Sequence, residues 1–116
     1  MDEIGFLEAV KAAIETCELE RYFLPSGMAL AALESHYSLA PDLAAIRTDI
    51  ESPGGIKGSH GQRRMLLVLV TLWNSKKAQD LFDEEFAVLP TVVMSMDGRN
   101  RGILAELLYT YPGWDG

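Results

Sequence analysis

A glycine-rich segment flanked by basic side chains has the residue types best suited to binding chemistry. Its glycines are Gly54, Gly55, Gly58 and Gly61, and its bases are Lys57, His60, Arg63 and Arg64. Glycine-rich turns that lead into a helix can hold phosphate or carboxylate groups, because backbone N–H groups point at the anion. A Gly-Lys-Ser/Thr triplet is missing, which excludes the usual phosphate-binding loop. The pattern predicts an anion-binding site at the four bases or, alternatively, a simple turn with solvated bases.

Nucleophilic and metal-binding residues are few and poorly spaced. The sequence has one cysteine, Cys17, and two histidines, His36 and His60. No Cys-x-x-Cys, His-x-x-x-His or His-Glu-x-x-His motif is present, so the spacing does not favour zinc. Cys17 lies on an apolar stripe, where a thiol packs as a small hydrophobic group. We therefore expect no catalytic residue, no metal and no cofactor, and we predict that the protein is not an enzyme.

The charge is unevenly distributed along the 116 residues. The net charge is -7, and all of it comes from residues 1–56, with ten acids and three bases, because residues 57–116 hold seven of each. This acidity argues against direct nucleic-acid binding, which requires basic contacts to phosphates. Segregated charge suits a protein partner or a second copy of the chain. The alternative is a set of solvated helix faces that keep a small domain soluble.

The sequence has neither the pattern of a secretory signal nor an apolar run long enough to cross a membrane, which predicts a soluble protein. The sequence starts Met-Asp-Glu and shows no basic segment followed by a long apolar one, as a secretory signal would. The longest apolar run, Met65–Val70, is far below the roughly 20 residues that cross a bilayer. A single cysteine fits a reducing compartment. We expect a cytoplasmic location and no membrane partner.

Helices must position these side chains, because apolar residues recur at steps of three and four. We predict helices over 2–22, with Asp2 as N-cap, over about 27–37, capped by Ser26, and a short one with Pro41 and Asp42 in its first turn. The last two would form a helical hairpin. Three more helices follow: from Ser59 to Trp73, from a Ser75 cap through Phe82, and from an Asp97 cap to Pro112. Residues 52–58 are the expected loop, and residues 91–96 are compatible with strand or helix.

These segments together predict an all-α fold, a compact bundle of about five to six helices. The chain length fits a single helical domain over 1–116, because a small chain cannot divide into two stable cores.

The apolar stripe of the first predicted helix and the aromatic residues near the C-terminus are candidate partner-binding surfaces. Tyrosine and tryptophan are enriched in binding hot spots, and three of them cluster near the C-terminus. Small helical domains also often pair through long apolar stripes. The predicted partner-binding residues are Phe6, Leu7, Val10, Ile14, Tyr109, Tyr111 and Trp114. For Trp114 the alternative is that it folds back and closes the core.

The overall pattern resembles a known family. It combines small size, acidity, a proline-split hairpin, the string Arg-Met-Leu-Leu-Val-Leu-Val-Thr-Leu-Trp-Asn (64–74) and the string Tyr-Pro-Gly-Trp (111–114). It looks like the small bacterial antiactivators of LuxR-type quorum-sensing regulators, of the QslA type. The resemblance implies a non-catalytic homodimer that binds the ligand-binding domain of a transcription regulator. Such binding would block the regulator's dimerisation or its DNA binding.

Two other functions fit the same sequence. One is an enzyme that binds an anion or small molecule at the Gly54–Arg64 segment, which would need a deep pocket there. The other is a toxin-immunity protein, which shares the acidic character and differs only in its partner.

Overall fold

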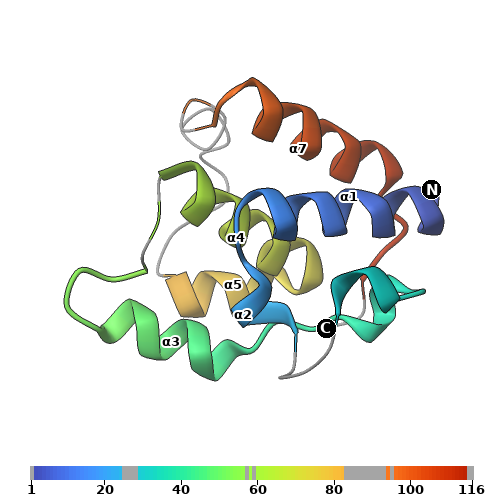
Figure 1. Ribbon diagram of the computed structural model, residues 1–116. Coiled ribbons are helices and arrows are strands. Elements are labelled where there is room, and N and C mark those ends of the chain that lie inside the picture. Colours follow the sequence, from blue (N-terminus) through green and yellow to red (C-terminus); the bar gives the residue numbers. More distant parts are fainter. Residues whose placement is uncertain are drawn as a thin grey trace.

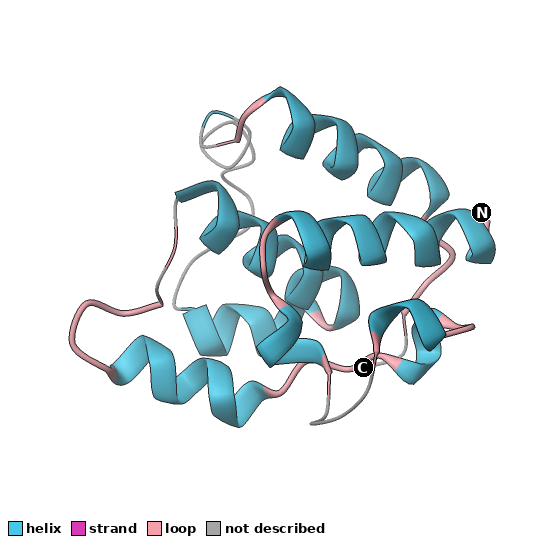
Figure 2. Cartoon of the chain, in the orientation of Figure 1, coloured by secondary structure: helices cyan, strands magenta, loops and turns pink. Residues whose placement is uncertain are grey.

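The fold was analysed in a computed structural model, which describes residues 2–24, 29–56, 58, 60–82, 94 and 96–114 (Figure 1). These residues form helices joined by loops, and no strand is present among them (Figure 2). The predicted all-α class is therefore confirmed. Figure 1 shows α7 lying beside α1 on one side of the molecule, α3 on the other, and α4 passing between them.

The first helix is shorter than the sequence predicted. α1 (Glu3–Thr16) begins at Asp2, whose carboxylate accepts the Gly5 backbone N–H at 2.9 Å. The chain then turns at Glu18, which has φ = 55°, and resumes as α2 (Glu20–Phe23). Because an α-helix cannot continue through a left-handed residue, the single helix predicted over 2–22 is wrong.

The helix predicted over 27–37 is also wrong. The described part of this segment holds two short 3₁₀ turns, η1 (Leu30–Ala32) and η2 (His36–Ser38), with extended backbone between them. The Ser35 hydroxyl accepts the Tyr37 N–H at 3.2 Å, a local bond that competes with helical pairing. The predicted hairpin is therefore absent, and its predicted cap, Ser26, lies outside the described residues.

The third predicted helix is present with a shifted start. α3 (Leu43–Glu51) is capped by Asp42, whose carboxylate accepts the Ala45 N–H at 3.0 Å. Pro41 precedes the cap instead of occupying the first turn. Ile46 is fully buried, and a glycine turn follows the helix as predicted, with φ of 87° at Gly54.

Two consecutive helices form the centre of the fold. α4 (His60–Trp73) contains the apolar run 65–70, all of it buried, which confirms a helix there instead of a strand. α5 (Ser75–Phe82) packs against it. The Asn74 side chain accepts the Lys77 N–H at 3.0 Å, so Asn74 caps α5 and the predicted cap Ser75 is its first helical residue. Ser59 lies outside the described residues.

The last helix packs along the first. α7 (Gly98–Thr110) begins at the predicted cap Asp97, whose carboxylate accepts the Asn100 N–H at 2.8 Å. The Asp2 N–H donates to the Thr110 carbonyl at 3.1 Å, which joins the start of α1 to the end of α7. Residues 91–93 and 95 lie outside the described part of the chain, so the predicted ambiguity over 91–96 stays open there.

The tail after α7 folds back and completes the core. Trp114 is 7% exposed, and its indole N–H donates to the Leu39 carbonyl at 3.1 Å. The Phe6 ring makes edge-to-face contacts with Trp114 and Tyr111, at centroid distances of 5.6 and 5.4 Å. Of the two alternatives for Trp114, closing the core is confirmed.

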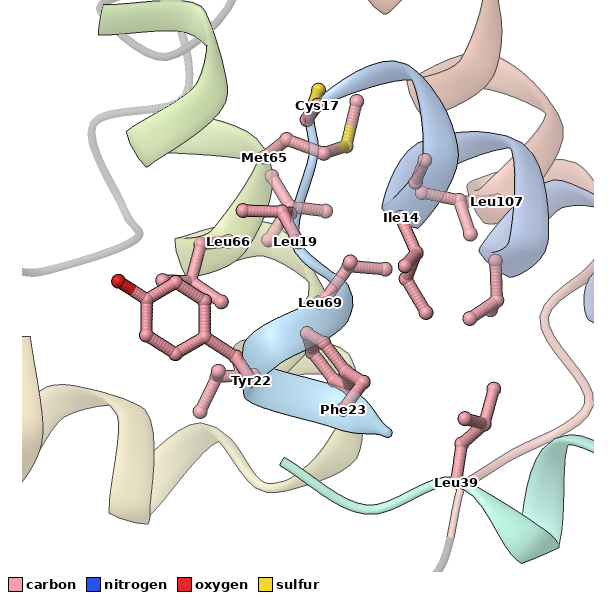
Figure 3. Close-up of a cluster of buried hydrophobic side chains, with 14 of the residues drawn as sticks. Ile14, Cys17, Leu19, Tyr22, Phe23, Leu39, Met65, Leu66, Leu69 and Leu107 are labelled. Atoms are coloured by element: carbon pink, nitrogen blue, oxygen red, sulfur yellow. The ribbon is translucent and has the colours of Figure 1, made fainter. Parts of the chain in front are cut away.

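The buried side chains of these elements form one hydrophobic cluster. Figure 3 shows part of it, where residues from the turn between α1 and α2 gather with residues of α4. The residues labelled there include Leu19, Tyr22, Phe23, Leu66 and Leu69.

The cap of α7 provides a test of this fold. Replacing Asp97 by alanine leaves the Asn100 N–H without its side-chain acceptor, so the free energy of unfolding should fall by about 1 kcal/mol. Urea denaturation measures the change. The control is Asp80→Ala on the exposed side of α5, which removes the same charge without a cap. Equal effects of the two substitutions would contradict the capping role.

Candidate functional site

A pocket of about 270 Å³ lies between α3, the glycine turn, α4 and α5. The described residues that line it are Ile50, Gly55, Ile56, Arg63, Arg64, Leu67 and Phe82. The structure thus brings Arg63 and Arg64, two of the four predicted anion-binding residues, into one concave site. Lys57 lies outside the described residues, and only the backbone of His60 lies within them.

The described lining of this pocket is apolar apart from two positive charges. Arg63 and Arg64 are half-buried and are the only charged groups among the seven lining residues. Both arginines also interact with other groups of the chain. The same residues include no hydroxyl, thiol, imidazole or carboxyl group. This lining can therefore bind an anion with an apolar part, and it supplies no nucleophile or proton-transfer group.

The glycine turn positions one wall of the pocket. Gly54 and Gly55 have φ of 87° and 68°, a conformation that other residues adopt only with strain. The Gly55 N–H donates to the Ser52 carbonyl at 2.9 Å and closes the turn. This turn directs Ile56 inward, where it is 7% exposed.

Most of the predicted partner-binding residues lie in the core instead of on the surface. Phe6, Leu7, Val10, Ile14 and Trp114 are buried. Tyr111 is half-buried, and its hydroxyl donates to the Leu72 carbonyl at 2.8 Å. The physical reason is that the tail and α7 cover the apolar stripe of α1. Tyr109, at 83% exposed, is the one residue of the seven that the structure presents to solvent.

The outward side of α7 combines the predicted residue Tyr109 with exposed neighbours that the sequence pattern did not single out. We define the α7 outer face as six of the eight exposed residues of this helix, Gly98, Arg101, Gly102, Ala105, Leu108 and Tyr109; the other two are Arg99 and Glu106. Leu108 is 50% exposed, because the buried stripe of α7 runs through Leu104, Leu107 and Thr110. A glycine within a helix, Gly102, was the available signal in the sequence.

The buried cysteine and histidine have structural partners. The Cys17 thiol lies 3.7 Å from Asn100 Oδ1, and burial, with a smaller contribution from the Asp97 charge, raises its pKa to about 11. His36 is 1% exposed, and its Nε2–H donates to the Gly113 carbonyl at 3.0 Å. The two side chains therefore fix α1 to α7 and η2 to the tail.

A second perturbed group links α2 to α3. The Tyr22 hydroxyl donates to Asp49, whose Oδ2 also lies 2.7 Å from Nη2 of Arg21. The Arg21 guanidinium stands over the Tyr22 ring at 5.0 Å. Burial first, and the hydrogen bond second, raise the pKa of Tyr22 to about 12. This arrangement holds two helices together and keeps the phenol protonated.

Three wider properties bear on function. Among the described residues, no three histidine, cysteine or acidic side chains gather closely enough to hold a metal ion. None of the described helices has the length and apolar character needed to cross a membrane. Comparison with protein-family models, with curated proteins and with solved structures finds no match.

The thiol environment makes a direct prediction. A thiol whose pKa rises from 9.0 to about 11 carries about one hundredth of the thiolate near neutral pH, so Cys17 should react very slowly with a disulfide reagent. Absorbance measures the rate in the folded protein, and the denatured chain serves as control. Equal rates before and after denaturation would contradict the buried position.

Proposed function

We propose that the protein acts without catalysis, by binding another protein through the α7 outer face. The observation that carries this proposal is the large apolar exposure on that face, from Tyr109 at 83% and Leu108 at 50%. Tyrosine is among the residues most enriched in binding hot spots, and neighbouring exposed apolar groups often mark interaction sites.

A helix-interior glycine supports the same surface. Gly102 lies within α7, where glycine costs about 1 kcal/mol relative to alanine. A Cβ at this position would meet no atom within 4 Å, so internal packing does not require glycine. A partner helix or strand that approaches the α7 backbone closely would give the glycine a use.

The charge of the face also differs from that of the whole chain. The net charge is -7, yet the exposed residues of α7 include two bases, Arg99 and Arg101, and one acid, Glu106. A face of this composition avoids repulsion from an acidic or neutral partner. An amphipathic helix of the partner would match a helical surface of this length.

The resemblance to LuxR-type antiactivators supplies the partner to test first. We propose that the chain binds the ligand-binding domain of a transcription regulator in the cytoplasm and blocks its dimerisation or DNA binding. This is a quorum-sensing antiactivator role.

The predicted homodimer is proposed to use the same face. Two copies paired through α7 would cover Tyr109. The regulator would then compete with the second copy for the same face. Sedimentation equilibrium of the wild type and of Tyr109→Ala tests this arrangement, and a monomer at all concentrations would contradict it.

A substitution at Gly102 should change stability and partner binding in opposite directions. Gly102→Ala should raise the free energy of unfolding by up to about 1 kcal/mol, because alanine is the better helix former. The same change should weaken binding to a purified LuxR-type ligand-binding domain, since a methyl group would hold the partner away. Urea denaturation and calorimetric titration measure the two effects.

Tyr109→Ala complements that experiment. It should weaken binding about tenfold or more if Tyr109 is a hot spot. The matched control is Tyr37→Ala, which removes a 53% exposed tyrosine from η2. Equal affinity of wild type and Tyr109→Ala for the regulator domain would contradict the proposal that the α7 outer face binds it. A regulator domain that does not bind the wild type would overturn the choice of partner.

A further inference from the structure

We propose that the pocket between α3, α4 and α5 binds a small organic acid, with its carboxylate toward Arg63 and Arg64 and its apolar part among the aliphatic and aromatic walls. The site is separate from the α7 outer face and shares no residue with it. In Figure 1, α3 and α7 lie on opposite sides of the molecule.

The size of the pocket limits the ligand. Its volume of about 270 Å³ lies just below the roughly 300 Å³ at which sites for drug-sized molecules begin. It exceeds the roughly 150 Å³ of an engineered cavity that holds one benzene ring in another protein. A ligand with one ring, or with a short aliphatic chain, therefore fits the available space.

The walls favour an apolar body. Ile56 and Leu67 are 7% and 2% exposed, and Ile50 and Phe82 are half-buried side chains of the described lining. Four apolar groups from three helices and a turn surround the space. Burying an apolar ligand against them removes apolar surface from water, which favours binding.

The two arginines favour a negative head group. They are consecutive residues near the start of α4, and both reach the same pocket. A guanidinium presents a planar set of donors that matches a carboxylate in a paired arrangement.

An acid with an apolar body satisfies both sets of groups at once. A neutral molecule would offer no negative charge to the two guanidinium groups, and inorganic phosphate would leave the apolar walls uncovered. The ligand class thus follows from the combination of charge and wall chemistry.

The test uses phenylacetate and octanoate as probes, titrated into the full chain labelled with ¹⁵N and ¹³C. We expect saturable shifts at the side-chain N–H groups of Arg63 and Arg64 and at the methyl groups of Ile50, Ile56 and Leu67. The dissociation constant should be on the order of 0.1–1 mM for a ligand of this size. The neutral analogue 2-phenylethanol should bind at least about tenfold more weakly than phenylacetate.

Substitutions provide the second arm. Arg64→Gln should weaken phenylacetate binding about tenfold, because it replaces the charged guanidinium by a neutral, shorter side chain that still donates hydrogen bonds. Arg99→Gln, at an exposed base on α7 away from this pocket, should leave binding unchanged.

Three results would overturn the inference. The first is no saturable shift at millimolar probe, and the second is shifts centred on other parts of the chain. The third is phosphate binding as tightly as phenylacetate, which would show that the apolar walls contribute nothing. None of these results bears on protein binding by α7, because wild-type chain without probe is used in that experiment.

Discussion

The return of the C-terminal tail across α1 is the interaction on which the rest of the packing depends. Residues 29–42 have little regular structure, and the backbone carbonyl of Leu39 is tied to the Trp114 indole at 3.1 Å. His36 is tied to Gly113, and its ring lies edge-to-face on Phe6 at a centroid distance of 5.0 Å. Residues 29–42 have few helical hydrogen bonds of their own. The contacts with the tail therefore stabilise this irregular segment against α1.

This packing decides which surfaces are open to partners. With the α1 stripe covered, Leu108 and Tyr109 on α7 are two adjacent residues among the large apolar side chains that stay exposed, which is why the proposed partner surface differs from the one expected from the sequence. The pocket at Arg63 and Arg64 is built from other elements and depends on the glycine turn after α3. The fold thus separates the proposed partner surface on α7 from the proposed ligand pocket at Arg63 and Arg64.

Features that depend on neighbouring residues could be predicted from the sequence, and features that depend on tertiary contacts could not. The caps Asp2 and Asp97 and the helix around residues 65–70 follow from neighbouring residues, so the sequence identified them. The left-handed Glu18 and the irregular course after residue 28 depend on tertiary contacts, which override apolar spacing. At the site, glycine and arginine patterning pointed to Arg63 and Arg64. The remaining walls come from α3 and α5, and no local pattern connects them.

The most direct test of the central interaction is the free energy of unfolding of Trp114→Ala, measured by urea denaturation beside Tyr109→Ala, which removes an exposed aromatic ring close by in the sequence. If the tail closes the core, Trp114→Ala should lose about 3–5 kcal/mol, or leave the chain unfolded, because a large buried ring and its hydrogen bond disappear. Tyr109→Ala should change the stability by no more than about 0.5 kcal/mol. A loss below about 1 kcal/mol for Trp114→Ala would contradict the account.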